Sequence, residues 1–174
     1  MDSLILYGSQ YGWAKRYAEA FSQMTGFPAV SYQDCGDLSS QGQIIYFGGL
    51  YAGGVKGLRQ TAGAFPPGAG VIIVTVGLAD VSDPENTGSI RRSVQKQVPE
   101  SVWDRAAVFH LRGGIDYSRL SFQHRTMMSL LHSKVKRLPE EKQTAETRGI
   151  LETYGKAVDF FDRDALTPIL DALR

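Results

Sequence analysis

Residues 4–21 read LILYGSQYGWAKRYAEAF, and this stretch decides the fold. An apolar, strand-like run, Leu4–Tyr7, enters a turn of small and hydroxyl residues, and apolar side chains at helical spacing follow over Ala14–Met24. A loop that ends at a helix N-terminus presents unpaired N–H groups and the positive end of the helix dipole. The stretch therefore predicts a phosphate-binding strand–loop–helix unit. The alternative is an ordinary turn with Ser9 as a cap.

Four more apolar runs recur along the chain, each followed by a helical stretch or a glycine-rich loop. The predicted strands are 29–32, 44–47, 71–76 and 106–111, and the predicted helices are 55–65, 84–98 and 166–173. Asp83 is suited to cap the second of these helices, with Pro84 at its first position. Strands that are apolar on both faces and alternate with helices predict an α/β fold, a doubly wound parallel sheet with helices on both faces.

The composition limits the class of protein. The 174 residues suit one domain over 1–174, and the net charge of +1 gives no field that would attract nucleic acid. A single cysteine, Cys35, and histidines without ligand spacing predict no metal site, and the cysteine usage suits a reducing cytoplasm. No apolar run approaches the ~20 residues of a membrane span. We therefore expect a cytoplasmic protein.

The segment 113–155 does not fit the alternation of strands and helices, and we expect it to be a helical insertion after the fifth strand. Leu120, Met127, Leu131, Val135 and Leu138 are predicted to share one helical face. Residues 119–137 carry five Lys or Arg and no Asp or Glu. Such a stretch is a solvated helix face, a peripheral membrane contact or a docking site for an acidic redox partner.

Glycine-rich loops follow the first, third, fourth and fifth predicted strands. They read GSQYGWA from Gly8, GGLYAGG from Gly48, TVGLAD from Thr75 and RGGIDY from Arg112. In a doubly wound sheet these loops meet along one edge, which is where ligands bind. Arg112 and Tyr117 either face that site or brace the insertion.

Four other classes are excluded by missing motifs. The chain has no Gly-x-Gly-x-x-Gly after the first strand, no Gly-Lys-Ser/Thr and no Gly-x-Ser-x-Gly, which argues against a dinucleotide-binding domain, an NTPase and a serine hydrolase. A receiver domain would need acidic residues where Gly8-Ser9 and Gly48-Gly49 stand.

With these motifs the chain resembles the flavodoxin family. GSQYGWA is similar to that family's phosphate loop, Ser/Thr-x-Thr-Gly-x-Thr, with Tyr11 and Ala14 where Thr is usual. GGLYAGG is similar to the loop that supplies an aromatic wall of the flavin, and TVGLAD stands where the second flavin loop belongs. The resemblance implies a five-stranded sheet of order 2-1-3-4-5 and non-covalent FMN.

The resemblance also implies which residues bind the cofactor. They are Ser9, Gln10, Tyr11, Gly12, Trp13 and Ala14 at the phosphate, and Gly49, Leu50, Tyr51, Ala52, Gly53, Thr75, Val76, Gly77, Leu78 and Asp80 around the ring. Tyr51 is expected to flank the ring.

Within the family, the plan of a long insertion after the fifth strand is similar to that of the menaquinone-linked protoporphyrinogen oxidases. The expected functions are thus an FMN-dependent electron carrier or an FMN-dependent oxidoreductase, with a quinone-using enzyme and a flavin-free binding module as alternatives. The expected partners are a redox protein or a small-molecule or quinone substrate, with a possible membrane contact through 119–137.

Overall fold

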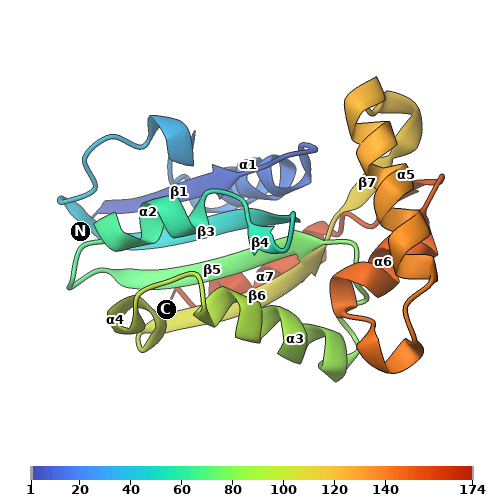
Figure 1. The fold of residues 1–174 in the computed structure, drawn as a ribbon. Helices are drawn as coiled ribbons and strands as arrows, with labels where there is room; N and C mark the ends of the chain where they lie inside the picture. Colours follow the sequence, from blue (N-terminus) through green and yellow to red (C-terminus); the bar gives the residue numbers. More distant parts are fainter. Residues whose placement is uncertain (1, 174) are drawn as a thin grey trace.

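The computed structural model describes residues 2–173. Five parallel strands form the central sheet in the order β2-β1-β3-β5-β6 (Figure 1). Counting the parallel strands alone, this is the predicted order 2-1-3-4-5. The strands are β1 (Asp2–Gly8), β2 (Ala29–Ser31), β3 (Gln41–Tyr51), β5 (Gly70–Gly77) and β6 (Ala106–Arg112). The predicted α/β, doubly wound fold is confirmed.

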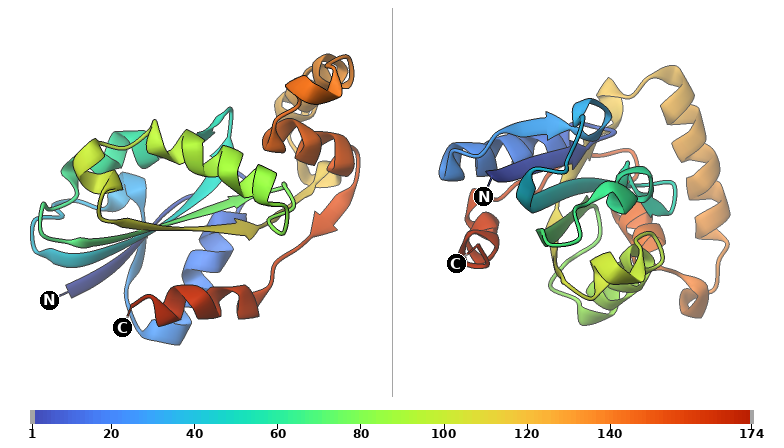
Figure 2. Two further views of the ribbon diagram at one scale, coloured as in Figure 1. Left: turned by 90° about the horizontal axis from the view of Figure 1, so that it is seen from below. Right: turned by 90° about the vertical axis from the view of Figure 1, so that its left-hand side faces the viewer.

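Helices cover both faces of this sheet. α1 (Trp13–Thr25) and α7 (Thr167–Asp171) lie on one face, and α2 (Leu58–Thr61), α3 (Pro84–Gln95) and α4 (Glu100–Trp103) lie on the other (Figure 2). Alternate residues of a strand serve the two layers: Leu4 and Leu6 pack on the α2–α3 side, whereas Ile5 packs against α1. The Asp83 carboxylate accepts a hydrogen bond from the Glu85 N–H at 2.9 Å, so the predicted cap of α3 is confirmed.

Two predicted boundaries were wrong beside β3. The loop expected from Gly48 is a continuation of β3, which runs to Tyr51 and turns back into β4 (Gly54–Val55). β4 includes Val55, the first residue of the helix predicted over 55–65. The rest of that segment contains only α2 (Leu58–Thr61) and a 3-10 turn (Ala62–Ala64). The chain stays extended because Gly48 and Gly49 pair with β5, while Leu50 and Tyr51 pair with Val55 and Gly54 across the hairpin.

The insertion stands at the carboxyl end of the sheet (Figure 1). It opens with β7 (Gly114–Asp116), continues through α5 (Phe122–Lys136) and α6 (Ala145–Thr153), and closes with β8 (Ala157–Asp159), which pairs antiparallel with β7. We call residues 114–159 the roof, and the parallel sheet with α1–α4 and α7 the frame. The face predicted from Leu120, Met127, Leu131, Val135 and Leu138 is only partly covered: Leu120 and Val135 are buried, whereas Leu131 is 36% exposed.

Candidate functional site

An apolar cavity of about 110 Å³ lies where β1, β3 and β5 end, beneath the roof. The frame supplies its floor from the loop after β1, the end of β3 and the loop after β5. The roof supplies the rest from β7, α5 and α6. The lining residues are Ser9, Gln10, Tyr11, Trp13, Ala14, Gly49, Leu50, Tyr51, Ala52, Val76, Gly77, Leu78, Ala79, Gly113, Gly114, Ile115, Met127, Met128, Glu146 and Ile150.

The loop between β1 and α1 has the features of an anion site. Gly12 takes a left-handed backbone (φ 93°) and passes directly into α1, whose first N–H groups have no partner within the helix. The Ser9 hydroxyl oxygen accepts a hydrogen bond from the Gly12 N–H at 3.0 Å, which leaves the hydroxyl proton to donate. Lys56 reaches this loop from the frame, with its Nζ 2.6 Å from Gln10 Oε1. Donors and a cation thus converge here.

The hairpin β3–β4 places an aromatic ring at the cavity. Tyr51 pairs with Gly54, so Ala52 (φ 52°) and Gly53 (φ 79°) form the two-residue turn, both left-handed. The Tyr51 ring meets the Tyr11 ring edge-on, with the ring centroids 6.1 Å apart. It is therefore held in a fixed orientation at the cavity wall.

Two tyrosine hydroxyls near the cavity are buried without a hydrogen-bond partner among residues 2–173. They belong to Tyr11, on the phosphate-type loop, and Tyr117, at the base of the roof. Burial, with a smaller contribution from Tyr51, raises the pKa of Tyr11. Burial raises the pKa of Tyr117 to about 12, with smaller contributions from Tyr154 and Tyr11. Both side chains are therefore neutral near pH 7, and each keeps a proton to donate.

The roof contacts the frame through polar groups of α5, α6 and β8, among them Arg148 Nη2 with Asn86 Oδ1 at 2.6 Å and Asp159 Oδ2 with Arg16 Nη1 at 3.0 Å. His124 Nε2 lies 3.4 Å from Gln10 Nε2, and the Tyr51 hydroxyl lies 3.9 Å from the Met127 sulfur. The Gly53 N–H donates to Glu146 Oε1 at 3.4 Å. α5 is thus tied to the loop after β1 and α6 to the hairpin.

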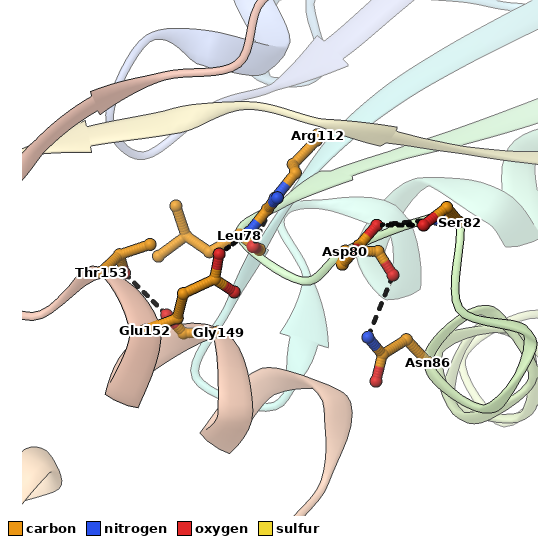
Figure 3. Close-up of polar contacts among 8 residues, drawn as sticks. All are labelled: Leu78, Asp80, Ser82, Asn86, Arg112, Gly149, Glu152 and Thr153. Atoms are coloured by element: carbon orange, nitrogen blue, oxygen red, sulfur yellow. Dashed lines mark hydrogen bonds and ion pairs between the residues drawn. The ribbon is translucent and has the colours of Figure 1, made fainter.

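Arg112 provides a further link, between the end of β6 and α6. Its Nε donates to the Leu78 carbonyl at 2.9 Å and its Nη2 lies 2.8 Å from Glu152 Oε1 (Figure 3). Of the two possibilities for this side chain, the structure shows the bracing one. Gly149 of α6 packs on the same loop, since a Cβ added there would come within 3.1 Å of the Ala79 nitrogen.

Most of the residues predicted to bind the cofactor gather at this cavity. Twelve of them line it, whereas Gly12, Gly53, Thr75 and Asp80 do not. Gly12 and Gly53 form the turns that shape its wall. Thr75 is buried in β5, with its hydroxyl oxygen 2.7 Å from His110 Nδ1. Burial, with a smaller contribution from Arg91, lowers the pKa of His110 to about 4, so this histidine is neutral near pH 7.

Asp80 lies on the outer side of the loop after β5. Its carboxylate accepts hydrogen bonds from the Ser82 hydroxyl and N–H, at 2.7 and 3.0 Å, and its carbonyl accepts one from the Asn86 side chain at 3.0 Å (Figure 3). The contacts lower the pKa of Asp80, the side-chain bond from Ser82 contributing most. Asp80 therefore orders the loop and is not at the cavity surface.

Sequence reasoning missed the residues that the roof brings to the cavity. Met128, Glu146 and Ile150 are 50 or more residues from the nearest loop of the frame that they meet, and no motif connects them with it. Sequence reasoning also missed Lys56. Its position two residues after the glycine-rich segment GGLYAGG could have indicated that its side chain lies near the carboxyl end of β3.

The residues at this edge fit FMN at both ends of that molecule. The α1 N-terminus, Ser9 and Lys56 are donors suited to a phosphate. The apolar walls with Tyr51 suit a flat ring. The cavity alone is smaller than the roughly 300–1,000 Å³ of typical ligand pockets. A second, more polar cavity of about 550 Å³ adjoins it and shares Gln10, Tyr11 and Trp13. A mononucleotide would need that adjoining space or an outward shift of the roof.

A doubly wound sheet with a ligand cavity at the carboxyl ends of its strands defines an α/β binding domain. The family model described as "Flavodoxin domain" matches residues 4–142, and the chain belongs to this family. No curated protein matches the sequence.

Solved structures are similar to this chain only at low sequence identity and low TM-score. A flavoprotein in complex with FMN from Lactobacillus acidophilus is 15% identical, covering 64% of this chain and 92% of that one, with a TM-score of 0.41. A variant flavodoxin from Pseudomonas aeruginosa is 20% identical, covering 77% and 96%, with a TM-score of 0.42.

Proposed function

We propose that this chain is an FMN-binding flavoprotein. The observation that carries the proposal is the position of the apolar cavity, which adjoins the amino end of α1 in a chain of the flavodoxin domain family. Bound FMN would supply one- and two-electron redox chemistry. The chain's part is to hold, orient and shield that group.

Each part of the site has a role in this proposal. The first N–H groups of α1 and the Ser9 hydroxyl bind the phosphate, and the Lys56 ammonium offsets its charge. Tyr51 and Leu50 form one wall for the ring. Met127, from the roof, excludes water from the other end of the cavity.

The roof favours an oxidoreductase over an open electron carrier as the finer function. α5 and α6 cover the cavity and contribute four of its lining residues, so a redox partner protein has restricted access to a bound ring. A small substrate, a quinone among the candidates, reaches such a site more easily than a protein surface does. This second proposal agrees with the resemblance to the menaquinone-linked protoporphyrinogen oxidases, which lies in the long insertion after the fifth strand.

The phosphate end is tested by Gln10→Glu. The change keeps the shape of the side chain and its contact with Lys56, so the fold is preserved, but it places a negative charge beside the phosphate. We expect the purified protein to bind FMN by visible absorbance and fluorescence titration. The variant should bind FMN about tenfold or more weakly, and riboflavin, which lacks the phosphate, unchanged.

The control is Gln33→Glu, the same charge change on an exposed residue of the 3-10 turn after β2, which does not line the cavity. Equal losses for FMN and riboflavin in Gln10→Glu would place the phosphate elsewhere. Failure of the unaltered protein to bind either flavin would overturn the proposal and leave the flavin-free binding module.

A further inference from the structure

The outer face of α5 is the most apolar exposed surface among residues 2–173. The three large apolar side chains that are exposed among these residues all belong to α5: Phe122 at 80%, Leu130 at 69% and, on the side of the helix that holds Val135, Leu131 at 36%. Phe122 and Leu130 are eight residues apart, which at about 100° per residue puts them on the same side of the helix. Met128 and Val135 face the opposite way and are buried. Two large apolar side chains thus project from a surface that the chain itself does not cover.

Basic residues surround this apolar pair. Residues 119–137 hold five of the chain's 19 Lys and Arg and none of its 18 acidic residues. Arg125 and Lys136 lie on one flank of the pair and Lys134 on the other, all exposed. Because the whole chain carries a net charge of only +1, this face is a local concentration of positive charge.

We propose that the outer face of α5 docks on the surface of an anionic lipid bilayer. Phe122 and Leu130 enter the headgroup region, and Arg125 and Lys134 lie against lipid phosphates. An apolar face flanked by cations is the pattern of helices that lie in a membrane interface. An acidic protein would account for the cations but leaves two projecting apolar side chains without a reason.

The contact is peripheral, since none of the described helices is long and apolar enough to cross a membrane. α5 has 15 residues, and its inner side supplies Met127 and Met128 to the cavity. A bilayer bound to the outer face therefore lies one helix thickness from the cavity. The proposal does not depend on whether the cavity binds a flavin.

Co-sedimentation with phosphatidylcholine vesicles, with and without phosphatidylglycerol, tests the proposal. We expect binding only to the anionic vesicles, weakening as salt is raised. Phe122→Gln with Leu130→Gln should lower the partition coefficient about tenfold or more. Arg125→Gln with Lys134→Gln should lower it by a similar factor.

The matched control is Arg92→Gln with Lys96→Gln, which removes one exposed cation from α3 and one from its C-cap and should leave binding unchanged. All of these side chains are exposed, so circular dichroism and thermal midpoints should match those of the unaltered protein.

Four results would overturn the proposal. The first is no binding to anionic vesicles. The second is binding that persists in the Phe122 and Leu130 double variant, which would show a purely electrostatic contact. The third is a dimer in sedimentation equilibrium that this variant dissociates while vesicles are ignored, which would make a second copy of the chain the occupant. Retention on polyglutamate without vesicle binding would likewise indicate an acidic protein.

Discussion

In the frame, Ile44, Ile45, Tyr46 and Phe47 of β3 have no exposed surface, whereas α5 in the roof buries only two of its fifteen residues. The frame packs two apolar clusters, one on each face of the sheet. The roof has one small cluster, built on Ile115, Leu120, Met128 and Ile150. Segments with few buried apolar contacts open at lower free energy than a packed core. The cavity therefore lies between a rigid floor and a cover that opens more easily.

This contrast suits the binding of a ligand larger than the cavity. The floor fixes the loop after β1 and the hairpin with frame contacts, such as the hydrogen bond from the Tyr46 hydroxyl to the Lys56 carbonyl at 2.6 Å. The cover is held by contacts of Arg112, Gln10 and Gly53, by the Arg148–Asn86 hydrogen bond at 2.6 Å and by the exposed Arg16–Asp159 ion pair at 3.0 Å. Surface ion pairs and hydrogen bonds contribute about 1 kcal/mol or less each, so the cover can be displaced without loss of the floor.

The largest expected effect is that of Gly8→Ala in the frame. A Cβ at Gly8 would overlap the backbone carbonyl of Lys56, and backbone cannot move aside as a side chain can. We expect the free energy of unfolding to fall by about 3 kcal/mol. Urea unfolding measures it, with Gly63→Ala as control, because a Cβ there meets nothing within 4 Å.

The matching change in the roof is Gly114→Ala, where a Cβ would overlap the Val158 carbonyl oxygen of β8. If frame and roof open separately, hydrogen exchange should rise over 114–159 while the strands of the sheet stay protected. A uniform rise over the whole chain would show that the two regions unfold as one unit, and the contrast between them would be lost.

The sequence predicted the frame well, and the physical reason is local. β5 is apolar at every buried position except Thr75, Asp83 and Pro84 mark the start of α3, and each signal lies within or beside the element that it specifies. Their sum is enough for a doubly wound sheet and for the strand ends where ligands bind.

The roof and the details of the site were less predictable because they depend on contacts distant in sequence. β7 and β8 have three residues each and are strands only because they pair with each other across forty residues. Glu146 and Ile150 reach the cavity through the packing of α6, which no local pattern encodes. The exposure of Leu131 could not be predicted, because a helical pattern shows which residues share a face and not how much of that face is covered.

A smaller effect is expected from Tyr11→Phe, at the boundary between frame and roof. Removal of a buried hydroxyl that has no partner should raise the free energy of unfolding of the flavin-free protein by about 1 kcal/mol. If that hydroxyl donates to a bound ligand, the same variant should bind FMN about threefold to tenfold more weakly. Thermal unfolding and flavin titration on the same sample measure both.

Tyr11→Phe is informative because it should raise the free energy of unfolding while it weakens FMN binding. A structural role for the hydroxyl would lower stability and leave flavin affinity unchanged. Tyr51→Phe is the control: its hydroxyl contacts only a methionine sulfur at 3.9 Å, so both quantities should stay nearly constant.

The smallest effect belongs to the hairpin that joins the two regions. Ala52 has a φ of 52°, a backbone strain that costs an alanine about 1 kcal/mol. Glycine would relieve this strain, but part of the gain is lost because glycine makes the unfolded chain more flexible. We therefore expect Ala52→Gly to raise the free energy of unfolding by about 0.5 kcal/mol, and Gly53→Ala to lower it by about 1 kcal/mol. A Cβ at Gly53 meets nothing within 4 Å, so backbone strain alone decides the sign of the change in the free energy of unfolding. Equal and negligible shifts in urea unfolding would mean that the turn relaxes freely. The hairpin would then belong with the easily opened roof, which it touches through Glu146, and not with the floor of the cavity.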